Sequence, residues 1–167
     1  MDFLAREYQD TGKSHRHQNV KNLKARKARG SDLVFKMSEQ VKIEGRLPSG
    51  AADSATVKVA SIVPFIVMKA MALADRLKAK DAWDIWFCLT NFSGGNTALA
   101  LAFQPHLRNK LVQEALAKIA DKFQSSAHFG PQSVADFDDI PPGDDRDLRV
   151  RDAFERVNDL LARLKVP

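Results

Sequence analysis

Hydrophobic residues change their spacing twice along the chain, near residue 31 and again near residue 64. Residues 1–30 carry few apolar side chains after Leu4. Short β-branched stretches follow, and beyond Pro64 the apolar residues recur with helical spacing. This division predicts an α+β, mostly helical fold, with strands over 31–60 and helices over 64–167.

Two stretches alternate β-branched and polar residues, QVKIEG at 40–45 and ATVKVAS at 55–61. Such alternation is typical of strands with one buried face. The segment between them, LPSGAAD, is rich in turn-forming residues. We therefore expect a small antiparallel hairpin or sheet, with DLVF at 32–35 as a further short strand.

The rest of the chain predicts four or five helices packed on that sheet. Pro64 suits the first turn of a helix, and Gly94-Gly95 suits a helix end. The segment DFDDIPPGDD at 136–145 is interpreted as an acidic linker. The expected helices cover about 65–77, 81–92, 96–104, 107–124 and 146–164.

The basic excess of the chain lies at its N-terminus. The 167 residues have a formal net charge of +5, and residues 1–30, with eight Lys/Arg and three Asp/Glu, hold all of it. We interpret residues 1–30 as a flexible basic arm and residues 31–167 as a neutral body. The arm is either solvated disorder or a contact to RNA or DNA phosphates. Its candidate nucleic-acid-binding residues are Lys21, Lys24, Arg26, Lys27 and Arg29.

Composition excludes several classes of protein. The single cysteine, Cys88, excludes an internal disulfide framework and a multi-thiolate zinc site. No apolar run reaches the roughly 18 residues of a membrane span, and the polar N-terminus does not resemble a signal peptide. We expect a soluble, cytoplasmic protein with no membrane partner.

Lys69 is the most unusual residue, because its neighbours over 65–74 are otherwise apolar. A buried ammonium needs a partner or loses its proton. Arg76 lies two helical turns further on, and Asp81 and Asp84 share a face of the next helix. One explanation is purely structural: Asp81 caps the second helix, Asp84 lies near its positive end, and Lys69 forms a core ion pair.

The segment VKVASIVPFIVMKAMALADRLKAKDAWDIWFCL also resembles the C-terminal signature of the AbiEii/AbiGii-type nucleotidyltransferase-like toxins. The family pattern is a strand, a helix with an embedded Lys and a trailing Arg, and then a basic-Asp-x-x-Asp helix start with aromatic residues. The resemblance is strongest over about 55–92. The matching positions are Lys69, Arg76, Lys80, Asp81 and Asp84.

This resemblance implies the toxin of a type IV toxin–antitoxin or phage-defence pair, which transfers a nucleotide from an NTP with Mg²⁺. It implies nucleotide binding by Lys69, Arg76 and Lys80. It also implies catalytic roles for Lys69, Asp81 and Asp84, with the aspartates orienting Lys69 or acting as a base.

Family members also carry an upstream Gly-Gly or Gly-Ser turn and an Asp-x-Asp pair, which this chain does not show before Lys69. Three later or isolated features imitate this pattern. We interpret Gly94-Gly95 as a helix end, Asp136-x-Asp138 as part of a linker, and Glu44 as an exposed strand residue. We therefore predict no metal ligands, and a truncated C-terminal half that is inactive alone. Its partner would be an antitoxin or an upstream-encoded half.

A non-catalytic module that binds protein or nucleic acid is the alternative function. We also expect self-association, because removal of a palm-like half would expose apolar surface on the hairpin and the 65–77 helix.

Overall fold

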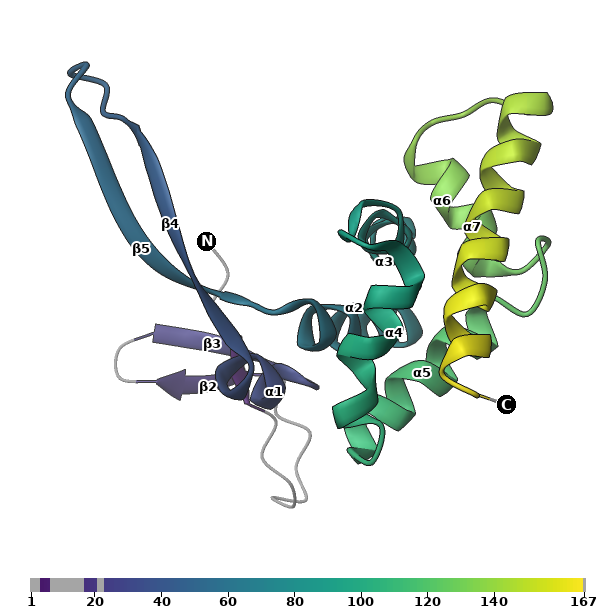
Figure 1. Ribbon diagram of the computed structural model, residues 1–167, viewed down its shortest axis with the longest axis horizontal. Coiled ribbons are helices and arrows are strands. Elements are labelled where there is room, and N and C mark those ends of the chain that lie inside the picture. Colours follow the sequence, from purple (N-terminus) through teal and green to yellow (C-terminus); the bar gives the residue numbers. More distant parts are fainter. Residues whose placement is uncertain (1–3, 7–16, 21–22, 167) are drawn as a thin grey trace. The chain divides into compact units, whose positions relative to one another are not determined.

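The computed structural model describes residues 4–6, 17–20 and 23–166 of the chain. It divides into two compact units, Met1–Phe65 and Ile66–Pro167, which we describe separately (Figure 1). Strands occur in the first unit, and all but two of the described helices lie wholly in the second. This α+β, mostly helical composition confirms the predicted fold class.

A small three-stranded sheet lies in the segment that we predicted as an arm. Strand β3 (Leu23–Ala28) pairs in parallel with β1 (Leu4–Arg6) and antiparallel with β2 (His17–Val20). Ala5 and Ala25 are buried, at 7% and 4% exposure. Because these two buried residues of β1 and β3 are alanines rather than β-branched residues, the strand signal of β1 and β3 is weak. The segment thus differs from the predicted arm wherever the structure describes it.

Residues 32–35 form part of a helix, α1 (Ser31–Lys36), so the predicted strand there is wrong. Gly30 precedes the helix with a φ of 87°, a conformation that glycine adopts without strain. Asp32 in the first turn and Lys36 in the last turn complement the helix dipole. These end effects outweigh the strand preference of the short apolar run.

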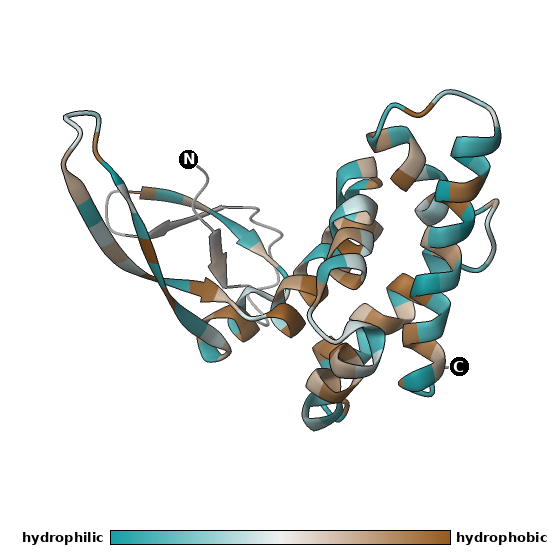
Figure 2. Ribbon diagram, turned by 45° about the horizontal axis from the view of Figure 1, so that its top comes forward, coloured by the Kyte–Doolittle hydropathy of each residue, from teal (hydrophilic) through white to brown (hydrophobic). Residues whose placement is uncertain are grey.

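The predicted antiparallel hairpin is confirmed. Strand β4 (Ser38–Arg46) pairs with β5 (Ala52–Ala60), and Val41 lies opposite Val57. The amide of Leu47 donates to the carbonyl of Ala51 at 2.9 Å and closes the turn. Hydrophobic and polar residues alternate over 41–44 of β4 and over 55–59 of β5 (Figure 2). One face of this part of the hairpin is therefore apolar, but every residue of β4 is exposed, so the predicted buried face of the strand is wrong in this structure.

Helix α2 (Ile62–Arg76) follows the hairpin and extends into the C-terminal unit. Pro64 lies in its first turn, as predicted, where the missing N–H costs no hydrogen bond. Ile66, Val67 and Leu73 are fully buried. The sequence therefore located this apolar helix correctly.

Five further α-helices complete the C-terminal unit, and none of the described helices is long and apolar enough to cross a membrane. The five helices, with a 3-10 turn (Gln104–His106) after α4, are α3 (Ala79–Asn91), α4 (Gly95–Phe103), α5 (Lys110–Lys122), α6 (Phe129–Phe137) and α7 (Asp144–Arg163). Helix α6 packs against α3 and α7, and α4 also packs against α7.

Helix α6 is the one that the sequence did not predict in this unit. Its second and third residues are Gly130 and Pro131, a pair that reads as a helix breaker. Proline is tolerated in the first turn, however, and both residues are buried. A Cβ at Gly130 would lie 2.4 Å from a ring carbon of Phe123, so glycine is required for close packing here. The predicted linker therefore contains the end of a helix.

Candidate functional site

Lys69 reaches two carboxylates across the α2–α3 turn. Its side chain is 22% exposed, although α2 is apolar on either side of it. Its Nζ lies 2.5 Å from Oδ2 of Asp84 and 3.6 Å from Oδ1 of Asp81. The ammonium is thus held in place by two negative charges, which offset the cost of its partial burial.

Arg76 binds Asp81 at two points. Its Nε donates to Oδ2 and its Nη2 donates to Oδ1, both at 2.7 Å. Asp81 is fully buried, and the Arg76 side chain is 39% exposed. The pKa of the Arg76 guanidinium is raised, chiefly by these hydrogen bonds and further by the charges of Asp81 and Asp84, against the opposing effect of burial. Paired donors of this geometry are among the strongest charge-assisted interactions.

Lys80 supplies the third cation. Its Nζ lies 2.9 Å from Oδ1 of Asp84, one helical turn further along α3. Asp84 is 8% exposed. Because its two carboxylate oxygens pair with different lysines, it links Lys69 to Lys80. The structure brings together all five residues that the sequence singled out in this region. We call Lys69, Arg76, Lys80, Asp81 and Asp84 the charged cluster.

The predicted capping role of Asp81 is wrong. Helix α3 has Lys78 at its N-cap, and Asp81 is the third helical residue. The backbone amide of Asp81 donates to the carbonyl of Lys78 at 3.0 Å. Its carboxylate still lies in the first turn, where a negative charge interacts favourably with the helix dipole. Any acidic residue in the first turn would have this interaction with the helix dipole, whereas the two hydrogen bonds from Arg76 require Asp81 at this position.

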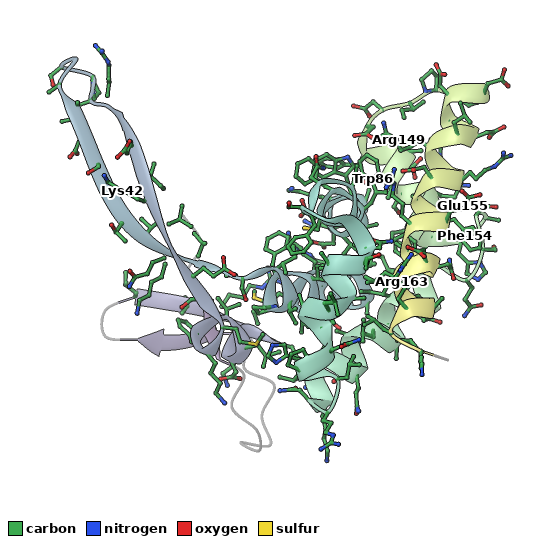
Figure 3. The ribbon with its side chains drawn as sticks, viewed as in Figure 1. Lys42, Trp86, Arg149, Phe154, Glu155 and Arg163 are labelled. Atoms are coloured by element: carbon green, nitrogen blue, oxygen red, sulfur yellow. The ribbon has the colours of Figure 1, made fainter. Side chains whose placement is uncertain are left out.

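Two tryptophans of α3 are anchored to other helices of the C-terminal unit. Nε1 of Trp83 donates to Oδ1 of Asp138, and Nε1 of Trp86 donates to Oδ2 of Asp152, each at 2.7 Å. Arg149 of α7 forms an ion pair with Asp138 and lies 4.4 Å from the ring centre of Trp86 (Figure 3). These contacts fix α3, and with it Asp81 and Asp84.

The sequence analysis interpreted Asp138 as part of a linker and did not single out Arg149 or Asp152. A buried indole N–H usually donates to an acceptor, so the two tryptophans predict that hydrogen-bond acceptors lie nearby. Their positions, 55 and 66 residues further along the chain, carry no local signal.

The residues present do not fit a Mg²⁺ site. Both aspartates of the cluster are already matched by cations, whereas a magnesium site needs carboxylates free to bind the metal. Across residues 4–6, 17–20 and 23–166, no group of three or more His, Cys, Asp or Glu side chains is placed to hold a metal ion. Asp136 pairs with Arg146, and Glu44 pairs with Lys42 on the exposed hairpin.

Cys88 lies on α3 one turn beyond Asp84 and is half-buried, so the predicted core thiol is only partly enclosed. Burial, chiefly, and the charge of Asp84 together raise its pKa to about 11, against the opposing charge of Lys69. A thiol with such a pKa is a poor nucleophile near neutral pH.

The basic residues of the N-terminal unit are placed only in part. Lys24 and Arg26 are exposed positions of β3, Lys27 is half-buried, and Arg29 is exposed just beyond the strand. Lys21 lies outside the described residues. Because Lys24 and Arg26 are two residues apart in a strand, they project from the same face.

An apolar helix pair that encloses a cluster of opposite charges is the pattern on which the family resemblance rests. Residues 31–162 match the model of the family described as nucleotidyl transferase AbiEii toxin, type IV TA system. The chain therefore belongs to the AbiEii family of nucleotidyltransferase toxins. Comparisons with curated proteins and with solved structures found no significant match.

Proposed function

We propose that this chain provides the phosphate-binding part of a nucleotidyltransferase site, in which Lys69, Arg76 and Lys80 bind the phosphates of an NTP. The placement of Lys69 supports this most strongly, since its ammonium is fixed between two carboxylates and its side chain as a whole is 22% exposed. Donors that are fixed in advance stabilise a negative charge without a cost of reorganisation.

Under this proposal the two aspartates position the cations. Asp81 is fully buried and both of its oxygens accept hydrogen bonds from Arg76. A group so enclosed is poorly placed to take a proton from an acceptor hydroxyl, because a general base must reach that proton. Its burial therefore supports the orienting role over the base role. Asp84 holds Lys69 and Lys80 in the same way.

We further propose that the chain acts as the C-terminal portion of the enzyme and does not transfer nucleotides alone. The carboxylates of the charged cluster pair with cations, so under this proposal the metal ligands are supplied from outside residues 31–167, by a part that carries a Gly-Gly turn and an Asp-x-Asp pair. Membership of a type IV toxin–antitoxin family implies an antitoxin as another partner.

The test combines binding and transfer by the purified chain. Labelled ATP should bind, and Lys69→Met should weaken that binding at least tenfold. Lys122→Met is the matched control, because Lys122 has a similar exposure of 26% and pairs with Asp121 outside the cluster. No label should enter total RNA with Mg²⁺ present. Incorporation that survives Asp81→Ala would contradict both the positioning role and the need for a second chain.

The exposed pair on β3 favours a second candidate function. Lys24 and Arg26 point from one face of a strand toward solvent, an arrangement suited to nucleic-acid phosphates. The chain would then be a binding module, in which β3 contacts RNA or DNA while the helices contact a protein. Binding that persists when the charged cluster is removed and is lost when Lys24 and Arg26 are neutralised would identify this function.

A further inference from the structure

An exposed aromatic surface adjoins the charged cluster. On α3, Lys80, Trp83 and Phe87 are spaced by three and four residues and share one face. Phe137 at the end of α6 packs beside Trp83. Phe87 is 45% exposed and Phe137 is 39% exposed. We call Trp83, Phe87 and Phe137 the aromatic strip.

The rings of the strip are held in a fixed arrangement. Trp83 and Phe87 are stacked, with ring centres 4.9 Å apart and planes 21° apart. The centre of the Phe137 ring lies 5.1 Å from that of Trp83. The hydrogen bond from Trp83 to Asp138 prevents rotation of the central indole. The strip is therefore organised before any ligand arrives.

A cation lies over the strip at the end nearest the cluster. The Nζ of Lys80 is 5.8 Å from the ring centre of Trp83 and 5.4 Å from that of Phe137. The cluster has three cations and two carboxylates and so carries a net charge of +1. An anionic ligand bound at Lys80 would therefore lie next to the exposed rings.

Nucleotides combine the two properties that this surface matches. Proteins that bind single-stranded nucleic acids place basic side chains on the phosphates and stack bases on aromatic rings. A protein partner would match the apolar rings but would not require the adjacent positive charge. The combination favours a nucleotide.

We propose that the aromatic strip is a stacking platform for the base of the NTP whose phosphates bind the charged cluster. The proposal rests on the phosphate-binding function above and adds the binding site of the base. Because every base has a π face, the platform accepts all four nucleotides and favours purines, which present the larger surface.

The test compares ATP with inorganic tripolyphosphate, which has the phosphates and lacks the base, by calorimetry on the purified chain. ATP should bind roughly 5- to 150-fold more tightly, the range expected for one stacked base. The double variant Phe87→Ala/Phe137→Ala should lose this preference and bind tripolyphosphate as the wild type does. Leu101→Ala, at an exposed apolar residue of α4, is the control and should change neither affinity.

A second variant protects the test against misfolding. Phe87→Leu/Phe137→Leu keeps the apolar volume and removes the aromatic faces, so it should reduce the preference for ATP without lowering the melting temperature. Equal binding of ATP and tripolyphosphate by the wild type would overturn the proposal and leave the phosphate site intact. Binding of neither would overturn both.

The same variants also test the strip as a protein interface. If they abolish self-association and leave the preference for ATP unchanged, the strip contacts protein and the proposal is wrong.

Discussion

Arg76 and Asp81 form a two-point ion pair in which only one partner is accessible to solvent. Asp81 is fully buried, whereas the guanidinium of Arg76 is 39% exposed, and both hydrogen bonds are 2.7 Å long. The two partners therefore respond differently to loss of the other. Without Asp81 the arginine is solvated, whereas without Arg76 the aspartate remains a charge in the interior, with only Lys69 at 3.6 Å to offset it.

We predict that Arg76→Met destabilises the fold more than Asp81→Asn. The buried carboxylate loses its two strongest donors in the first variant, and removal of one partner of a buried pair costs about 3–5 kcal/mol. The second variant leaves an exposed arginine and keeps a buried polar group that can still accept a hydrogen bond. For it we expect a loss of about 1–3 kcal/mol. Urea unfolding followed by circular dichroism measures both.

The control for this comparison is Arg163→Met. Arg163 and Asp159 form an ion pair as well, here within one helix and one turn apart, but their side chains are 43% and 45% exposed. Exposed pairs contribute at most about 1 kcal/mol. Equal losses for Arg76→Met and Asp81→Asn would contradict the importance of burial at this pair.

We predict energetic coupling between Trp86 and Arg149. The guanidinium carbon of Arg149 lies 4.4 Å from the ring centre of Trp86, which is 9% exposed. A cation over a partly desolvated indole is worth about 1–2 kcal/mol. A double-mutant cycle of Trp86→Leu and Arg149→Met, measured by chemical unfolding, should therefore give an interaction energy of about 0.5–2 kcal/mol. Additive losses would show that the contact contributes nothing.

The sequence predicted the elements that carry strong periodic patterns. The hairpin and helices α2, α3 and α7 have regular apolar spacing and were found near their true positions. Strands β1 and β3 were not predicted because their buried residues, Ala5 and Ala25, are small, and α6 was not predicted because Gly130 and Pro131 lie in its first turn. In both cases packing against residues distant in the sequence determines the structure, and the local hydrophobic pattern does not predict such packing.

The charged cluster was predictable for a different reason. A lysine within an apolar helix needs a partner of opposite charge, and the candidate aspartates follow within 15 residues.

The aromatic strip was predictable only in part. Trp83 and Phe87 were visible beside the aspartates, but Phe137 comes from a segment that reads as a linker. Its contact with Trp83 depends on the packing of α6 against α3.

We predict slow modification of Cys88 in the native protein. Burial and the charge of Asp84 raise its pKa from about 9.0 to about 11, which lowers the thiolate fraction at pH 8 roughly 100-fold. Iodoacetamide should therefore react that much more slowly with native than with urea-unfolded protein. Asp84→Asn should lower the pKa, and Lys69→Met should raise it. Shifts in the reverse directions would contradict the placement of Cys88 beside the cluster.

The same pKa shift has a consequence for stability. Below pH 9 the thiol is protonated in the folded and the unfolded state, so its contribution does not change with pH. Between pH 9 and about 11 the unfolded chain loses the proton first, and stability should fall as pH rises. Cys88→Ala should remove this part of the alkaline transition.

We predict that RNA binding, if it involves β3, depends on salt through Lys24 and Arg26. Each phosphate contact that is lost should reduce the slope of log K against log salt by about 0.7 on single strands. Lys24→Gln/Arg26→Gln should therefore lower the slope by roughly 1.4. Lys110→Gln/Lys165→Gln is a charge-matched control in the other unit. Binding that does not change between low and high salt would exclude this role.

We predict that the hairpin mediates self-association through its apolar face. Val41 and Ile43 lie opposite Val57 and Ala55, and their exposed fractions are 40% and 55%. An isolated two-stranded ribbon is marginally stable in water, so covering this face is favourable. Val41→Thr/Ile43→Thr keeps the strand preference and reduces the apolar area. It should weaken self-association about tenfold or more, as measured by sedimentation equilibrium.

The control for the hairpin uses its polar face. Lys42→Thr/Glu44→Thr changes the alternating positions of the same strand, where the two side chains pair with each other, 62% and 69% exposed. This variant should associate as the wild type does, because its apolar face is intact. A wild-type chain that stays monomeric at high concentration would contradict the prediction. Equal weakening by both double variants would instead point to a general loss of strand structure, and not to contact through Val41 and Ile43.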